Sequence, residues 1–201
     1  MKSLFLALLL TVALPVAAAA GKKRIVIIGD SITEGYGVAS ALAYPSLMQK
    51  KADAEGLKWE VVNAGISGST TSSALLRLTW HLKKKPDLIV LALGANDGLR
   101  GIEPKLVEEN LAKAIEECKN NKVKVLLVGM KLPPNYGDAY LAKYKIIWGR
   151  LASRYKIPFV PFLLEGVAGN PSLNQADGIH PNEKGQVIIG DMMFTAIKKN
   201  L

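Results

Sequence analysis

The chain has 201 residues, of which 49% are hydrophobic, and this is enough apolar material for one buried core. Its formal net charge is +9, but the lysines are scattered and carry no aromatic-basic pattern, so we expect a solvated basic surface and no nucleic-acid partner. One cysteine, Cys118, excludes an internal disulfide, and two well-separated histidines lack the ligand spacing of a metal site, so no metal or cofactor is expected.

The first twenty residues have the pattern of a secretory signal peptide. Lys2 supplies the positive start, residues 4–16 are almost continuously apolar, and residues 17–20 are alanines, which suit signal cleavage. The alternative is an uncleaved anchor, because the apolar stretch approaches the length of a membrane span. The alanine-rich end favours cleavage. We therefore expect removal of residues 1–20, a single domain over residues 21–201 with no stable membrane anchor, and a periplasmic or secreted location.

Short apolar runs alternate with longer helical patterns along the rest of the chain. The runs predict five strands, at 24–28, 59–62, 88–93, 124–128 and 157–160. The intervening patterns predict five helices, at 41–54, 71–84, 103–120, 138–155 and 181–199. Asp138 is expected to cap the fourth helix, and Pro181 is expected in the first turn of the last one. This alternation is typical of the α/β class, a three-layer α/β/α sandwich with a mainly parallel five-stranded sheet.

Several loops with polar or glycine residues follow the predicted strands. Ser31 comes just after the first strand, segments 65–68 and 94–97 follow the second and third, and segment 130–137 follows the fourth. Ligands of parallel sheets bind at the carboxyl ends of the strands. We therefore expect these loops to converge on one edge of the sheet and to form a site there.

Ser31 and His180 are the candidate nucleophile and general base. A serine hydroxyl becomes reactive when a base removes its proton, and a carboxylate commonly orients that base. His180 is nearly the only choice, because His81 lies inside a helical pattern and is predicted to be a surface residue. Asp177 precedes His180 by three residues, so a turn can fold its carboxylate back onto the imidazole. Taken singly, each residue also has a simpler explanation, Ser31 at a helix N-terminus and His180 as a helix cap.

A nucleophilic serine also needs donors for the negative charge that develops on the substrate oxygen. The candidates are the backbone N–H groups of Ser31 and Gly68 and the side-chain amide of Asn96. Glycine lets a backbone approach a substrate closely. Alone, Gly68 and Asn96 are explained equally well as turn residues.

The chemistry-bearing residues form four blocks in a fixed order: Gly29-Asp30-Ser31, Gly68, Gly94-Ala95-Asn96-Asp97 and Asp177-Gly178-Ile179-His180. Together they resemble the SGNH (GDSL-type) hydrolase superfamily, over essentially all of residues 21–201. The resemblance implies a flavodoxin-like fold. It also implies that Ser31 is the nucleophile, that Asp177 and His180 complete a triad, and that Ser31, Gly68 and Asn96 form the oxyanion hole.

Three further segments, 96–101, 131–137 and 161–165, resemble the periplasmic multifunctional acyl-CoA thioesterase, lysophospholipase and arylesterase branch of that superfamily. This resemblance implies hydrolysis of esters and thioesters that carry acyl or aryl groups. It also implies that the loop 132–136 borders the substrate groove, with contacts from Leu132, Pro133, Asn135 and Tyr136. The same loop can be interpreted as a proline-rich turn that packs on the rim.

The sequence thus predicts a monomeric serine esterase with a small-molecule ester or thioester substrate. A carbohydrate O-deacetylase on the same fold is the enzymatic alternative, although the apolar residues around 132–136 favour acyl substrates. A non-catalytic secreted binding domain agrees less well with the complete set of chemical residues. A nucleotide-binding protein would need a spaced glycine pattern that the chain lacks.

Overall fold

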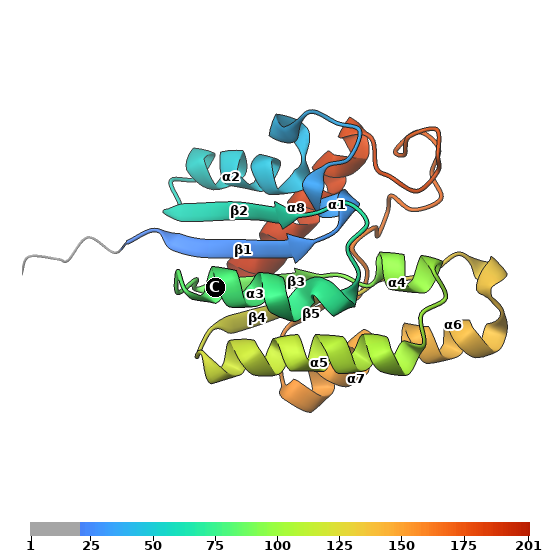
Figure 1. The fold of residues 1–201 in the computed structure, drawn as a ribbon. Coiled ribbons are helices and arrows are strands. Elements are labelled where there is room, and N and C mark those ends of the chain that lie inside the picture. The colour runs from blue at the N-terminus through green and yellow to red at the C-terminus, as the bar shows by residue number, and fades with distance from the viewer. Residues whose placement is uncertain (1–20) are drawn as a thin grey trace, which may run out of the picture.

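The computed structural model describes residues 21–201, and the predicted signal peptide lies outside the described residues. All five strands pair in parallel, in the order β2-β1-β3-β4-β5 (Figure 1). Their bounds are β1 Lys23–Gly29, β2 Trp59–Gly65, β3 Leu88–Ala92, β4 Lys124–Val128 and β5 Phe159–Val160.

Helices cover both faces of the sheet (Figure 1). One face carries α2 (Tyr44–Ala54) and α8 (Glu183–Asn200), which pack against each other. The other carries α3 (Ala74–Leu82), α5 (Pro104–Asn120) and α7 (Ile147–Tyr155). The short elements are α1 (Ser31–Glu34), α4 (Ala95–Leu99), α6 (Asp138–Lys145) and the 3₁₀ turns Ser40–Leu42, Thr71–Ser73 and Pro134–Tyr136. The predicted three-layer α/β fold is confirmed. Among residues 21–201, no helix combines the length and apolar character that a membrane crossing needs.

The central strands are buried from end to end. Every residue of β3 and the apolar stretch Ile25–Ile28 of β1 has no exposed surface. A strand that is covered on both faces cannot alternate apolar with polar side chains, and this explains the continuous apolar runs in the sequence. Cys118, on α5, is also fully buried, and burial raises the pKa of its thiol to about 12.

The predicted helix over 138–155 is two helices, α6 and α7, which meet at Ile146. Both halves pack on α5, but their other partners differ: α6 also packs on the 3₁₀ turn Pro134–Tyr136, whereas α7 also packs on β4 and β5. The expected cap at Asp138 is wrong. Gly137 occupies the capping position with φ +80°, so Asp138 lies inside the first turn.

The last helix begins two residues later than predicted. Pro181 is outside it, because its backbone forms an isolated antiparallel bridge with Asn174. Asn182 caps the helix instead: its Oδ1 accepts hydrogen bonds from the backbone N–H groups of Lys184 (3.0 Å) and Gly185 (3.2 Å). The prediction missed this cap because Pro at the first helical position is also a common start signal.

The prediction that His81 lies on the surface is wrong. Its ring is only 9% exposed, because the face of α3 that carries Leu78, His81 and Leu82 packs against the protein interior. Burial lowers the pKa of His81, and the positive charges of Arg24 and Arg77 lower it further. His81 is therefore a structural residue on the opposite side of α3 from solvent.

Candidate active site

Ser31 is the first residue of α1, which follows the end of β1 after the single residue Asp30. Figure 1 shows α1 at the carboxyl end of β1. The Oδ1 atom of Asp30 caps α1 by accepting a hydrogen bond from Ile32 N–H (3.1 Å). The helix packs directly on two glycines. A Cβ added to Gly29 would lie 1.9 Å from Thr33 Oγ1. A Cβ added to Gly65 would lie 2.2 Å from the backbone nitrogen of Glu34, in α1. The turn that presents Ser31 therefore depends on both glycines.

The structure brings Ser31, His180 and Asp177 together in one hydrogen-bonded chain. His180 Nε2 lies 2.9 Å from Ser31 Oγ, and His180 Nδ1 lies 2.7 Å from Asp177 Oδ2. Asp177 Oδ1 also accepts hydrogen bonds from the backbone N–H groups of Ile179 (2.9 Å) and His180 (3.0 Å). The spacing of three residues thus folds the carboxylate back onto the ring. The Tyr36 ring packs on the other side, 4.7 Å from the imidazole between centroids.

The electrostatic state of Asp177 follows from these contacts. The backbone hydrogen bond from His180, its side-chain hydrogen bond and the Ile179 N–H bond together lower the pKa of Asp177 to about 2. The carboxylate is therefore ionised at neutral pH and accepts the Nδ1 proton. This fixes the neutral tautomer of His180 whose Nε2 has a free lone pair towards Ser31.

Gly68 and Asn96 lie on the neighbouring loops of the same edge. Strand β1 lies between β2 and β3, with Gly29 in register with Gly65 and with Ala92, so the loops that follow these strands start side by side. Asn96 Nδ2 donates a hydrogen bond to the backbone oxygen of Ser69 (3.0 Å), which joins the two loops. Gly68 has φ +75°, a conformation that favours glycine.

Three residues that the sequence analysis did not assign to the site hold this edge together. The buried Asp97 carboxylate accepts hydrogen bonds from Thr71 N–H (2.9 Å) and Thr71 Oγ1 (2.6 Å). Arg100 Nη2 donates to the backbone oxygen of Gly68 (3.1 Å). Arg77 Nη2 donates to the backbone oxygen of Gly29 (3.0 Å) and also to that of Ala64, so it joins the ends of β1 and β2. Asp97 had a sequence signal as the last residue of its block and Arg100 as part of segment 96–101, whereas Arg77 had none.

Asp30 is a buried carboxyl group directly beside the candidate nucleophile. It is 1% exposed, and burial raises its pKa to about 6. The hydrogen bond from Ile32 N–H and the positive charge of Arg77 act in the opposite direction. Arg77 therefore partly compensates the Asp30 charge while it holds the strand ends.

An apolar cavity of about 490 Å³ opens beside this edge. Its walls come from the helix that begins at Ser31, from α4, from the loop after β4 and from the segment before His180. Most of the lining is apolar: Ile32, Ala95, Leu99, Met130, Leu132, Pro133, Pro134, Phe162, Leu164, Ala168 and Ile179. Leu132 and Pro133 thus line it, whereas Asn135 and Tyr136 do not. The Tyr136 hydroxyl instead donates to the backbone oxygen of Leu99 (3.1 Å), which anchors the loop to α4.

A comparison with known protein families shows to which family the chain belongs. The GDSL-like Lipase/Acylhydrolase family matches residues 27–188. The chain belongs to this family. The predicted superfamily is therefore confirmed, and the match extends from the strand before Ser31 to beyond His180 in this GDSL-like protein.

Individual relatives of the GDSL-like chain resemble it over most of their length. Esterase TesA from Pseudomonas aeruginosa is 41% identical, over 89% of this chain and 90% of its own. Thioesterase 1/protease 1/lysophospholipase L1 from Escherichia coli K12 is 38% identical, over 87% and 83%. The crystal structure of the psychrotrophic esterase EstA from Pseudoalteromonas sp., inhibited by monoethylphosphonate, has a TM-score of 0.85 at 34% identity and covers 89% of this chain and 98% of that one.

Proposed function

We propose that this GDSL-like protein is a serine hydrolase that cleaves carboxylic esters and thioesters through a covalent acyl-enzyme. The single observation that carries the proposal is the chain of contacts from Ser31 Oγ to His180 Nε2 (2.9 Å) and from His180 Nδ1 to Asp177 (2.7 Å). These distances are those of an activated nucleophile with an oriented base. The ester-hydrolase reaction class also agrees with the family to which the chain belongs.

In the proposed reaction, Ser31 Oγ attacks the carbonyl carbon of the substrate while His180 Nε2 accepts the hydroxyl proton. Asp177 stabilises the imidazolium that forms. The carbonyl oxygen becomes an oxyanion, and the N–H groups of Ser31, Gly68 and the Asn96 amide donate hydrogen bonds to it. His180 then protonates the leaving alcohol or thiol. Water, deprotonated by His180, then attacks the acyl carbon; the bond to Ser31 Oγ breaks, His180 returns the proton to that oxygen, and the acid is released.

The cavity supports acyl or aryl substrates rather than acetylated sugars. Its largely apolar lining and its volume of about 490 Å³ suit a hydrocarbon chain, whereas a sugar deacetylase would need only a small acyl site beside polar groups that bind the sugar. We assign Leu132 and Pro133 to contacts with the acyl group. We assign Asn135 and Tyr136 to the part of the loop that holds these two in place, since Tyr136 is anchored on α4.

The proposal also covers the export, location and oligomeric state of the enzyme. We propose that residues 1–20 direct export and are cleaved, and that residues 21–201 act as a monomeric single domain in the periplasm or outside the cell. The apolar core followed by four alanines supports export. The continuity of one sheet through the described residues supports the single domain.

A fluorophosphonate probe tests the nucleophile directly. The phosphorus reacts with an activated serine, so we expect one covalent adduct per chain, located on Ser31 by peptide mass spectrometry. Ser31→Ala is expected to abolish labelling completely. Ser153→Ala, which removes an exposed serine on α7, is the control and is expected to label normally. Labelling that persists in Ser31→Ala would refute the mechanism.

The acyl-chain assignment predicts a length-dependent effect of filling the cavity. Ala168 lines the cavity and is exposed, so Ala168→Trp adds bulk there without disturbing the core. Each buried methylene contributes about 0.8 kcal/mol, so exclusion of two methylenes is expected to lower kcat/KM for a dodecanoyl p-nitrophenyl ester by about tenfold relative to the butanoyl ester. Ala41→Trp, at an exposed alanine outside the cavity, is the control. Equal effects on both esters would contradict the assignment.

A further inference from the structure

Helix α3 exposes large apolar side chains on the face that points away from the sheet. Leu76 is 81% exposed and Trp80, one turn later, is 56% exposed, with Leu75 exposed beside them. The opposite face of the same helix is buried in the core, through Leu78 and Leu82 among others. Packing within residues 21–201 therefore accounts for the inner face of α3 and leaves the outer apolar stripe without a protein partner in the described part of the chain.

Lysines continue this stripe at the carboxyl end of α3. Lys83, Lys84 and Lys85 follow in sequence and are all exposed. Lys84 Nζ lies 4.7 Å from the centroid of the Trp80 ring, so cationic and aromatic groups share one surface. The exposed stripe thus changes from apolar to positively charged along its length.

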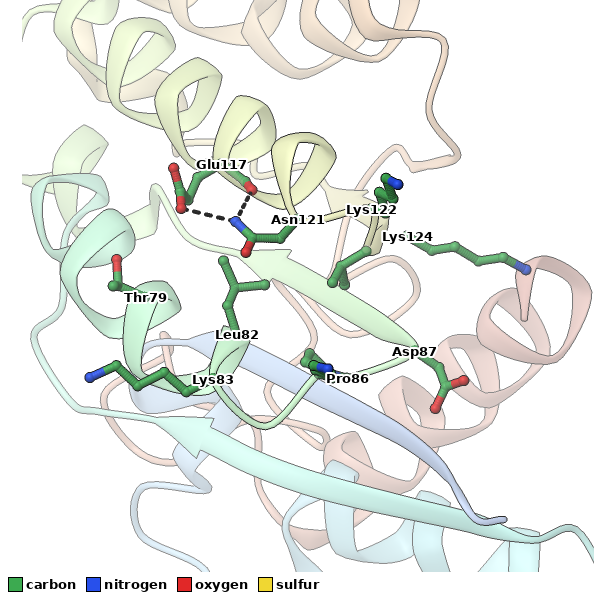
Figure 2. A pocket seen from close by; sticks show the side chains of 11 residues that line it. Thr79, Leu82, Lys83, Pro86, Asp87, Glu117, Asn121, Lys122 and Lys124 are labelled. Carbon is green, nitrogen blue, oxygen red and sulfur yellow. Dashed lines mark hydrogen bonds between the residues drawn. The ribbon is translucent and has the colours of Figure 1, made fainter. Parts of the chain in front are cut away.

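The positive charge extends across a neighbouring cleft of about 700 Å³, at the end of the sheet away from Ser31 (Figure 2). Lys122 and Lys124 line the far side of this cleft. The two carboxylates of the cleft already have partners: Asp87 accepts from Lys23 Nζ (3.0 Å), and the Glu117 carboxylate accepts from Asn121 Nδ2 (3.0 Å). The cleft is lined by four lysines, Lys83, Lys85, Lys122 and Lys124, but by only two carboxylates, so positive charge is in excess there.

We propose that the outer face of α3, together with Lys83, Lys84 and Lys85, binds a membrane surface that contains anionic lipids. Leucine and tryptophan at this spacing suit the boundary between headgroups and acyl chains, and adjacent lysines attract anionic headgroups. The excess of 26 basic over 17 acidic residues in the chain favours the same kind of partner. Binding through this face goes beyond ester hydrolysis and does not require it.

The position of α3 connects this face with the candidate active site. The 3₁₀ turn Thr71–Ser73 directly precedes the helix, and its first residue is hydrogen-bonded to Asp97, next to Asn96. The amino end of α3 therefore lies beside the edge that carries the candidate site, whereas the lysines that follow α3 lie at the opposite end of the sheet. This arrangement suits an enzyme whose substrates are amphiphiles in or near a lipid layer.

Vesicle co-sedimentation tests the charge requirement. The mature chain carrying Ser31→Ala is mixed with vesicles of phosphatidylcholine alone or with 30% phosphatidylglycerol, so that binding is measured without the proposed hydrolysis. We expect at least tenfold tighter binding to the anionic vesicles in 0.1 M NaCl and release in 0.5 M NaCl. Each lysine contributes about fivefold near an anionic surface, so Lys83→Gln with Lys84→Gln is expected to weaken binding by about 25-fold. Equal binding to both vesicle types would overturn the proposal.

Apolar substitutions test the face itself. Leu76→Ser with Trp80→Ser is expected to weaken vesicle binding by at least tenfold, because two exposed apolar side chains no longer enter the lipid boundary. The matched control is Leu106→Ser with Val187→Ser, at exposed apolar positions on α5 and α8, and it is expected to bind like the parent chain. Thermal melts check that all variants fold. If the α3 variant and the control variant bind vesicles equally well, the outer face of α3 is not the membrane contact.

Tryptophan fluorescence gives an independent readout. Trp59 and Trp148 are buried, so quenching by brominated lipids reports on Trp80. We expect strong quenching with anionic vesicles and none in Trp80→Phe. Absence of quenching in the bound parent chain would refute insertion of this face. If sedimentation analysis instead gives a dimer that Leu76→Ser with Trp80→Ser dissociates, the face belongs to a second copy and the membrane proposal fails.

Discussion

Replacement of His180 by alanine is expected to lower kcat for p-nitrophenyl butanoate by roughly 10⁴- to 10⁶-fold, with KM changed by less than about threefold. The reason is the geometry: His180 Nε2 is 2.9 Å from Ser31 Oγ, and in the proposed reaction it accepts the serine proton and passes it to the leaving group. Without it, the serine stays protonated at neutral pH and only the oxyanion donors still act. Steady-state kinetics on the purified variant measure the effect.

The control for this variant is the other histidine. His81 is buried on α3 and makes no hydrogen bond to Ser31, Asp177 or His180 within residues 21–201. His81→Gln is expected to retain kcat within about threefold, with any loss appearing in the melting temperature. Retention of more than a tenth of the activity in a folded His180→Ala variant would mean that another group is the base.

Replacement of Asn96 by alanine is expected to lower kcat by about 10²- to 10³-fold, the usual effect of removing one oxyanion donor. An amide nitrogen has two N–H groups. One of those on Asn96 is directed at the backbone oxygen of Ser69 (3.0 Å), which fixes the amide, and the proposed mechanism assigns the second N–H to the substrate oxygen. The loss should fall on kcat rather than on KM, because the donor acts mainly on the charge of the transition state.

Asn110 offers a matched control for this effect. Its Nδ2 donates to Thr71 Oγ1 (3.2 Å), so it supports the same loop from α5 but has no proposed contact with substrate. Asn110→Ala is expected to keep kcat within about tenfold of the parent. Equal losses of kcat in both variants would mean that Asn96 only anchors the loop and does not belong to the oxyanion hole.

The parallel sheet could be predicted because burial on both faces leaves a direct trace in the sequence, the unbroken apolar runs of β1 and β3. The turn from Asp177 to His180 could also be anticipated, because its contacts lie within three residues. The placement of Ser31 beside His180 came from the ordered blocks and the expected convergence of loops. Those two residues are 149 positions apart, and spacing alone says nothing about such a contact.

The features that the sequence analysis missed or misplaced depend on contacts with residues far away in the sequence. Arg77 looked like one more basic residue on a helix, yet its contact with Gly29 spans 48 positions. His81 was misplaced because helical periodicity does not state which side of α3 faces the sheet. The division at Ile146 depends on which neighbours each half of the segment packs against, and these belong to β4, β5 and α5. Tertiary packing decides all three, and local pattern does not encode it.

The glycines beneath α1 have a consequence for how the nucleophile is positioned. Thr33 and the helix backbone occupy the volume where side chains of Gly29 and Gly65 would stand. The main chain beneath the turn therefore carries no side chain that could change rotamer and push α1 away. The helix rests on a surface of fixed volume, and the direction of Ser31 Oγ depends on rotation of the Ser31 side chain, which the contact with His180 Nε2 (2.9 Å) restricts.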